Sequence, residues 1–373
     1  MLHIKRRVFK LELRCKRSKL KRKVSNTIKS AGWEAVERAK LNLANVKKKT
    51  KNKNKSFVFV VKNRRVRFYS PRHINYYNKS DYEKTNRFIN ELRDCVMKGC
   101  RAYIDFSNTE KISAAAMISF LAEVDILIKK SCHGVRAIGF SNPKNKKIES
   151  ILNQVGFYDL LKKDKRETEI YDDVTFWKYT SGACSEPLLA KSMIIDIKKE
   201  LEQKSSKRLY RGFIEAMSNS VEHAYLDCDK CTESDGTAKW WTFAGIYDKK
   251  LIIVICDKGV GIPATLPKTQ GAKLLIRILK SLGVSCVNVK DSMYIKTSTI
   301  LRETRTGKTN RGKGLHDIKS VIDLVGDGYM GIFSNKGRYI YKGKAANVSE
   351  VLTDYKSSVN GTIIEWAIPC EVE

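Results

Sequence analysis

LYRGFIEAMSNSVEHAY, residues Leu209–Tyr225, and LIIVICDKGVGIP, residues Leu251–Pro263, are the two segments that best predict the fold of this 373-residue chain. In the first segment Glu215, Asn219 and His223 recur every four residues, so they share one face if the segment is helical. Its apolar side chains, which predict a buried side of that helix, are Phe213, Ile214, Met217 and Val221. In the second segment an apolar strand leads into Asp257, Gly259 and Gly261.

The polar residues of these segments suit the binding of a phosphorylated ligand. A carboxylate and a carboxamide one helical turn apart can orient a water molecule and ligate a hard cation such as Mg²⁺. A carboxylate at a strand end can accept a hydrogen bond from an amino-substituted ring, and nearby glycines let backbone approach a ligand closely. Each pattern alone is equally typical of a polar helix face or an ordinary turn. Two later segments extend the pattern: RGKGLHDI (Arg311–Ile318) and GTIIEWAIP (Gly361–Pro369).

In this order the four segments resemble the motifs of the GHKL ATPases and kinases, which share the Bergerat ATP-binding fold. The first is similar to the N box, the second and third to the two glycine boxes, and the fourth to the closing strand with its threonine. The resemblance implies that residues 186–373 form an α/β sandwich, with a mixed sheet and helices on one face. It also implies that ATP and Mg²⁺ are the cofactors.

The resemblance further implies a role for each residue of the first two motifs. Glu215 is the expected general base toward the γ-phosphate, and Asn219 is the expected Mg²⁺ ligand. The residues expected around the adenine are Asp257, which accepts from its amino group, Gly259, Gly261, Ile262 and Thr362. His223 is expected to be structural, since a lone histidine on a helix is more often satisfied in the core.

The second glycine box is expected to hold the phosphates, because its glycines precede a helix whose N-terminus attracts anions. The nucleotide-binding residues predicted there are Arg311, Gly312, Lys313, Gly314 and Leu315. Between the glycine boxes, residues 264–311 are rich in Ser, Thr, Gly, Lys and Arg, which predicts a mobile ATP lid with a short helix at Leu274–Leu282.

Residues 57–165 alternate strand-like and helix-like segments, which predicts an α/β layer. IDFSNTEKISAAAMISFL (Ile104–Leu121) and the NQVGF turn (Asn153–Phe157) resemble a STAS domain, the fold of anti-sigma-factor antagonists. Where that family carries a phosphorylatable serine, this chain has Ala114 preceded by Ser113. We therefore expect a docking module rather than a phosphorylation switch. Residues 166–185 are the expected linker to the ATP-binding domain.

The net charge of +32 is unevenly distributed along the chain. Residues 1–56 carry 20 Lys and Arg against three Glu, a net of +17, which predicts a basic extension with a polyanionic partner such as nucleic acid. The alternative is a solvated segment rich in Lys and Asn. No apolar run approaches the roughly 18 residues of a membrane span, and the ten irregularly spaced cysteines indicate reduced thiols, so we expect a cytoplasmic protein without membrane contact.

The N box EAMSNSVEHAY is most similar to that of anti-sigma-factor serine kinases. The predicted function is therefore that of a bacterial-type regulatory protein, which binds Mg-ATP under a lid and switches its contacts with a protein partner. Slow hydrolysis or serine/threonine-kinase-like transfer would accompany the switch. The alternative is a non-catalytic ATP sensor that binds nucleic acid through residues 1–56. The sequence leaves an ATP-dependent homodimer open.

Overall fold

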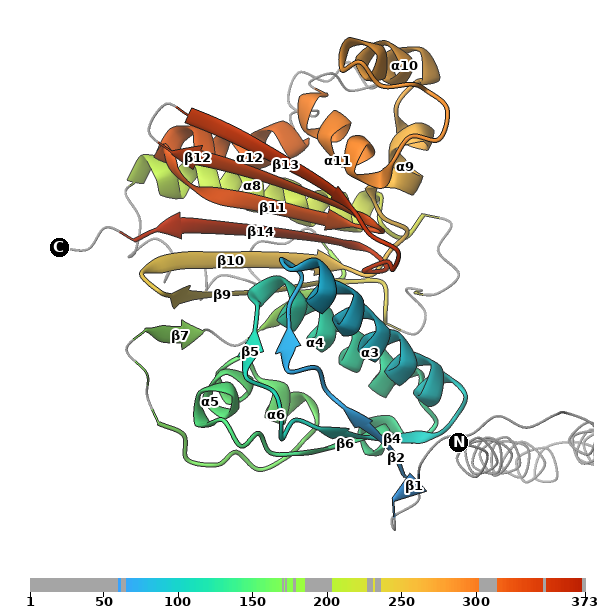
Figure 1. The fold of residues 1–373 in the computed structure, drawn as a ribbon, viewed down its shortest axis with the longest axis vertical. Coiled ribbons are helices and arrows are strands. Elements are labelled where there is room, and N and C mark those ends of the chain that lie inside the picture. The colour runs from blue at the N-terminus through green and yellow to red at the C-terminus, as the bar shows by residue number, and fades with distance from the viewer. Residues whose placement is uncertain are drawn as a thin grey trace, which may run out of the picture.

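The computed structural model describes residues 60–61, 65–169, 171, 173–176, 179–184, 203–226, 231, 236–301, 314–344 and 347–370. These residues form helices and three sheets, so the predicted α/β (α+β) class is confirmed (Figure 1). The basic extension over residues 1–56 and most of the helix expected over Glu186–Ser206 lie outside the described residues.

The first half of the chain forms a four-stranded sheet in the order β1-β2-β4-β6. β2, β4 and β6 are parallel, and β1 pairs with β2 in an antiparallel hairpin. A short pair, β3 with β5, stands apart. The elements are β1 (Val60–Val61), β2 (Arg65–Tyr69), β3 (His73–Ile74), α3 (Lys79–Met97), β4 (Arg101–Asp105), β5 (Lys111–Ile112), α4 (Ala114–Lys130), the 3-10 helix η1 (Gly134–Ala137), β6 (Ile138–Ser141), α5 (Lys146–Gln154) and α6 (Phe157–Leu160). Gly156, with φ of +87°, separates α5 from α6 within the NQVGF turn.

The second half is built on an eight-stranded sheet in the order β13-β12-β11-β14-β10-β9-β7, with β8 also paired to β9. Every pairing described in this sheet is antiparallel, so the predicted mixed sheet is wrong. Its strands are β7 (Val174–Phe176), β8 (Thr180–Gly182), β9 (Trp240–Tyr247), β10 (Lys250–Asp257), β11 (Asp327–Ser334), β12 (Gly337–Lys344), β13 (Asn347–Asp354) and β14 (Thr362–Pro369). The expected linker, residues 166–185, thus contributes β7 and β8 to the sheet.

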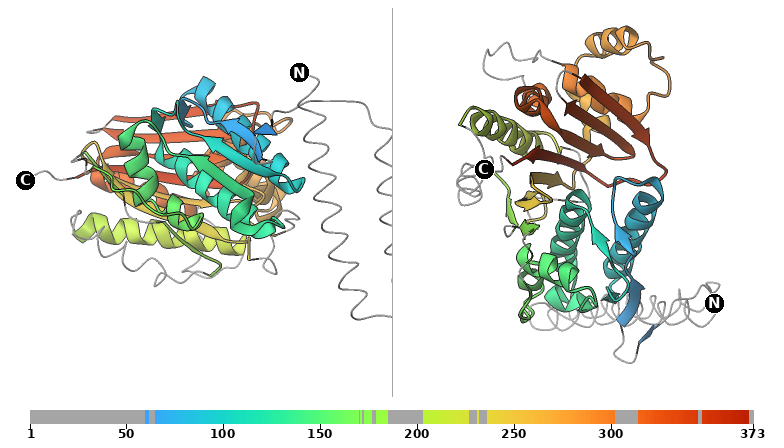
Figure 2. Two further views of the ribbon diagram at one scale, coloured as in Figure 1. Left: turned by 90° about the horizontal axis from the view of Figure 1, so that it is seen from below. Right: turned by 60° about the vertical axis from the view of Figure 1, so that its left-hand side comes forward.

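The connection between β9 and β10 is the DKK turn. Asp248 and Lys249 take φ values of 50° and 58°, as a tight hairpin with primed turn geometry requires. The lid region differs more from its prediction. Residues 262–301 contain three helices rather than one, and these share a small apolar cluster around Leu266, Leu275 and Leu279. They are α9 (Ile262–Thr269), α10 (Ala272–Ser281) and α11 (Asp291–Ile300), at one end of the large sheet in Figure 1 and in the right-hand view of Figure 2.

One face of the large sheet is covered by α8 (Gln203–Glu222) and α12 (Gly314–Val325), which lie side by side. Alternate strand residues supply this face, because side chains along a strand point to opposite sides. The strand residues packed under the two helices include Ile253, Ile255, Met330, Ile332, Ile364 and Trp366. Trp366 also donates its indole N–H to the Ile318 carbonyl oxygen of α12 at 2.9 Å.

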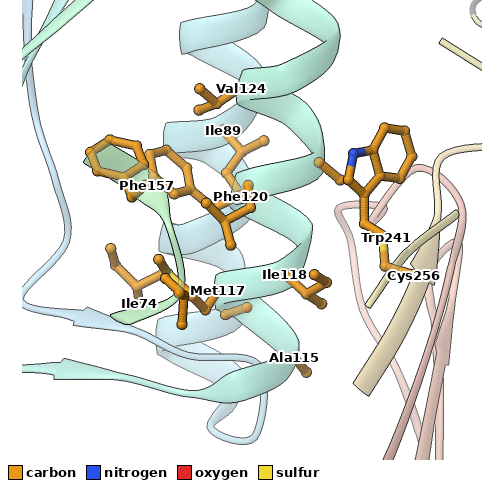
Figure 3. Packing of buried hydrophobic residues seen from close by; sticks show 14 of the residues in the cluster. Ile74, Ile89, Ala115, Met117, Ile118, Phe120, Val124, Phe157, Trp241 and Cys256 are labelled. Carbon is orange, nitrogen blue, oxygen red and sulfur yellow. The ribbon is translucent and has the colours of Figure 1, made fainter. Parts of the chain in front are cut away.

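The opposite face is covered by α4 of the first half of the chain, whereas α8 and α12 of residues 186–373 share one face, as predicted. α4 packs across β9, β10 and β14, and its residues Ala114–Leu127 are all buried. Figure 3 shows Ile118 directed toward Trp241 and Cys256 of the sheet, while Phe120 lies on the other side of α4 near Phe157. A helix that is buried around its whole circumference belongs to a core, and here that core joins both halves.

The N-terminus of α4 is held by the buried carboxylate of Glu365 on β14. Its Oε2 accepts a hydrogen bond from the Ala115 amide at 2.8 Å, and its Oε1 accepts from the hydroxyls of Tyr77 and Tyr329, both at 2.7 Å. The carboxylate satisfies an amide that a buried helix end would leave unpaired, and its negative charge suits the helix dipole. Ser113, at the N-cap, makes no capping hydrogen bond with its side chain.

Glu365→Ala is expected to lower the free energy of unfolding by about 3 kcal/mol or more, because three buried donors lose their acceptor. Glu365→Gln is expected to cost less, since its amide oxygen still accepts from the two tyrosines. Urea unfolding followed by tryptophan fluorescence measures both. Glu110→Ala, which removes an exposed ion pair with Arg72, is the control and is expected to have an effect below about 1 kcal/mol. An effect of Glu365→Ala no larger than this control contradicts the anchoring role.

Candidate functional site

The candidate site is centred on Asp257, the last residue of β10. Its carboxylate is buried, and its Oδ1 accepts hydrogen bonds from the backbone amides of Gly259 at 3.0 Å and Thr362 at 3.2 Å. Ser220 of α8 lies close enough to the carboxylate to lower its pKa, while the Ser220 hydroxyl donates to the Ala216 carbonyl oxygen at 3.0 Å. Burial nevertheless dominates and raises the pKa of Asp257 to about 6. The carboxylate is therefore fixed in position but largely ionised at neutral pH.

The glycines after Asp257 are required by close backbone contacts. A Cβ on Gly259 would stand 2.0 Å from the Ala224 carbonyl oxygen at the end of α8, which also accepts from the Val260 amide at 2.8 Å. Gly261 has φ of +82°, and a Cβ there would stand 2.8 Å from the Asn335 side chain. The first glycine box thus joins β10 to the C-terminal end of α8, and its glycines serve this packing directly.

Thr362 lies beside Asp257, as predicted, because the two residues are register partners on β14 and β10. Its hydroxyl is 3.0 Å from that of Ser334, the last residue of β11. Ser334 also accepts from the Ile262 amide at 2.8 Å, so Ile262 begins α9 next to the same strand ends. Asp257, Gly259, Gly261, Ile262 and Thr362 are therefore brought together at one end of the sheet.

The N box forms the C-terminal part of α8, confirming the predicted helix. Glu215 and Asn219 are both half-buried, on the same side of the helix, and Asn219 directly precedes Ser220, which reaches Asp257. His223 is also half-buried, and its Nδ1 is a buried atom with no hydrogen-bond partner in the described part of the chain. Among the described residues, this nitrogen therefore makes no hydrogen bond that would support the structural role expected of His223.

The second glycine box is described only from Gly314, which begins α12. Arg311, Gly312 and Lys313 lie outside the described residues, as does the side chain of Leu315. The direction of α12 follows from its contacts: Ile318 lies over Trp366, and Ile322 lies against Gly343, which pairs with Gly328 at the far end of the sheet. The N-terminus of α12 therefore points toward the end of the sheet that carries Asp257.

Several residues of the site were not predicted from the sequence. Ser220 and Ser334 supply hydroxyls beside Asp257 and Thr362, and Lys258 extends to the opposite face of the sheet. The buried Lys258 ammonium donates to the Ser119 hydroxyl of α4 at 2.7 Å and to the Val359 carbonyl oxygen at 3.1 Å, and burial lowers its pKa. Strand alternation could have placed Lys258 opposite Asp257, but the sequence does not identify α4 as its neighbour.

A buried carboxylate, neighbouring hydroxyls and a helix N-terminus lie at one end of the sheet, and together they could accept a hydrogen-bond donor and attract an anion. Among the described residues no group of three or more His, Cys, Asp or Glu side chains could hold a metal ion. Mg²⁺, which often takes only one or two protein ligands and completes its shell with phosphates and water, is compatible with Asn219 as its protein ligand.

No protein-family model matches the chain, and comparison with curated proteins finds no related sequence. In the described part of the chain, no helix combines the length and apolarity that crossing a bilayer requires.

Replacing Asp257 with asparagine is expected to change how stability depends on pH. Because the folded-state pKa is raised from 3.8 to about 6, the folded wild-type protein favours the protonated carboxyl, and this contribution is lost as pH rises from about 4 to 6. Asparagine does not titrate, so the stability of Asp257→Asn relative to wild type should rise by on the order of 3 kcal/mol across that range. Urea unfolding at several pH values measures the difference.

Asp105→Asn provides a control of opposite sign. Hydrogen bonds from Ser107 and Ser141, with the charge of Arg67, outweigh partial burial and lower the pKa of Asp105. Its ionised form therefore stabilises the fold above the unfolded-state pKa, and this contribution disappears as pH falls. The stability of Asp105→Asn relative to wild type should consequently decrease as pH rises through the acidic range. Equal slopes for the two variants would contradict the burial of Asp257.

Proposed function

We propose that the chain is a GHKL-type ATP-binding regulatory protein, with its nucleotide site between α8, the end of β10 and the N-terminus of α12. The observation that carries the proposal is the buried Asp257 carboxylate, which stands next to Thr362 and contacts Ser220 in the N box. Residues of the first, second and fourth motifs, which are far apart in the sequence, thereby lie at one end of the sheet. The STAS-like assignment of the first half is part of the same proposal.

In the proposed site Asp257 accepts a hydrogen bond from the adenine amino group, and this favours adenine over guanine, which presents a carbonyl at the equivalent position. Asn219 holds Mg²⁺ against the phosphates. Glu215 accepts the proton of an attacking water or hydroxyl. Bound Mg²⁺ supplies charge neutralisation at the phosphate oxygens. Gly314 and the preceding glycine box offer backbone amides to the same phosphates.

The switching part of the proposal rests on the contact between the two halves. Asp257 faces α8, and the next residue, Lys258, faces α4. A ligand bound at Asp257 would therefore be one residue away, along the chain, from a side chain that contacts the STAS-like half. We propose that this half docks a regulatory protein partner in the cytoplasm and that ATP changes the contact. An ATP-dependent homodimer is a further form of the same switch. The alternative, a non-catalytic sensor that binds nucleic acid through residues 1–56, rests on the charge of that segment.

Asp257→Asn is expected to weaken ATP binding by about tenfold or more, because a charged acceptor is replaced by a neutral one. Isothermal titration calorimetry with ATP and GTP in the presence of Mg²⁺ tests this, with wild type expected to prefer ATP. Asp323→Asn, an exposed carboxylate on α12, is the matched control and is expected to leave affinity unchanged. Failure of the wild-type protein to bind ATP, or equal binding by Asp257→Asn, contradicts the proposed site.

Glu215→Ala is expected to retain ATP binding and lose phosphoryl transfer, since a general base contributes about 10²- to 10⁴-fold to rate. Incubation with γ-labelled ATP and Mg²⁺ distinguishes free phosphate from labelled protein, and therefore hydrolysis from kinase activity. Glu222→Ala, an exposed glutamate on the same helix, is the control and is expected to keep full activity. Binding without any chemistry in the wild-type protein would favour the non-catalytic sensor.

A further inference from the structure

The four-stranded sheet of the first half has one face that the function proposed above does not use. α3 and α4 lie between this sheet and the large sheet (Figure 1), and the strand residues directed toward them, such as Val66, Ala102 and Ile104, are buried. The alternate residues point the other way. They are Arg65, Arg67 and Tyr69 on β2, Arg101, Tyr103 and Asp105 on β4, and Gly139 and Ser141 on β6. We call this set the Arg/Tyr face.

The Arg/Tyr face combines cations with aromatic rings on neighbouring strands. Arg67 is the register partner of Tyr103, and its guanidinium lies 5.5 Å from the ring centroid. Tyr69 follows two residues later on the same strand and is 66% exposed, more than any other tyrosine in the described chain. Side chains two residues apart on one strand share a face, so the two rings stand on the same surface of adjacent strands.

The arginines of this face are placed against one another at an electrostatic cost. Arg65 and Arg101 are register partners, so two like charges stand side by side on neighbouring strands. Burial, followed by the charge of Arg101, lowers the pKa of Arg65. The Arg65 guanidinium occupies the space beside Gly139, where a Cβ would stand 1.6 Å from its Nη1. An anion bound between the two guanidinium groups would relieve this repulsion.

We propose that the Arg/Tyr face binds single-stranded nucleic acid. Tyr69 and Tyr103 stack on unpaired bases, and Arg65 and Arg101 contact the phosphates between them. An open sheet surface with aromatic side chains is suited to splayed bases, whereas the stacked and paired bases of a duplex are inaccessible to such rings. An acidic peptide would use the arginines but would have no need of the two rings.

Net charge also distinguishes a nucleic acid from two other candidate ligands of this face, residues 1–56 and a second copy of the chain. Residues 1–56 carry a net charge of +17, and the whole chain carries +32. Neither that segment nor a second copy of the chain is therefore complementary to a face of three arginines. A polyanion is complementary, and the strand residues of the face include one carboxylate, Asp105, which is already held by Ser107, Ser141 and Arg67.

The test uses the full chain and an oligouridine of about ten nucleotides, a length matched to one binding module. Fluorescence anisotropy is expected to show that Tyr69→Ala and Tyr103→Ala each weaken binding by about fivefold or more, from the loss of one stacked base. Arg65→Gln and Arg101→Gln are expected to reduce the slope of log affinity against log salt by about 0.7 for each phosphate that the variant no longer neutralises. Thermal unfolding verifies that each variant is folded.

Two controls separate this face from the general charge of the protein. Arg72→Gln removes an exposed arginine in the same half that is paired with Glu110, and Tyr171→Ala removes a partly exposed ring elsewhere; neither is expected to alter binding. Photocrosslinking with 5-iodouridine is expected to label peptides containing Tyr69 or Tyr103. Crosslinks confined to residues 1–56, or affinities unchanged by the two tyrosine variants, would overturn the proposal. So would equal binding to polyglutamate or anionic vesicles that is independent of the tyrosines. ATP binding at Asp257 is unaffected by either result.

Discussion

The buried carboxylate of Glu365 fixes where α4 begins, and the relation between the two halves of the molecule follows from that helix. α4 is surrounded by protein from Ala114 to Leu127, so water cannot satisfy the amides of its first turn. A charged acceptor from the opposite sheet supplies the missing partner, and Tyr77 and Tyr329 stabilise it. Removing any one of these groups leaves the others without a hydrogen-bond partner in a core that excludes water. The contact between the halves is therefore specific as well as extensive.

This contact places two chemically different environments on either side of the large sheet. Asp257 and Lys258 are consecutive residues, yet one contacts Ser220 under α8 and the other contacts Ser119 on α4. Successive side chains along a strand point to opposite faces of the sheet, and this explains why the two residues contact different helices. Asp257 on the α8 side and the Lys258 contact to α4 are therefore separated by a single peptide bond.

Most of the elements could be predicted from local sequence. The hairpin turn at Asp248 and Lys249 and the helix at Leu209–Tyr225 follow from short patterns with a clear physical meaning. The position of Thr362 beside Asp257 was expected only from the resemblance to a known family. The antiparallel order of the large sheet and the place of β7 and β8 could not be predicted, because pairing depends on residues distant in sequence. The contact between Glu365 and Ala115 spans 250 residues, and nothing near either residue indicates its partner. The short helix predicted at Leu274–Leu282 corresponds to α10, but α9 and α11 were missed because the polar composition of the region outweighed the apolar repeat in each short segment.

The electrostatics of Asp257 favour a ligand-binding role over a purely structural one. Its backbone hydrogen bonds, from Gly259 and Thr362, need only a single acceptor oxygen, which asparagine would also provide. The carboxylate is instead retained where burial raises its pKa to about 6, so at neutral pH its charge reduces the stability of the fold. A residue that is costly to the fold, in a position where a neutral isostere satisfies the local geometry, is expected where a ligand supplies the compensating interaction. In the proposed site an adenine amino group would donate a hydrogen bond to this carboxylate and so supply the compensating interaction.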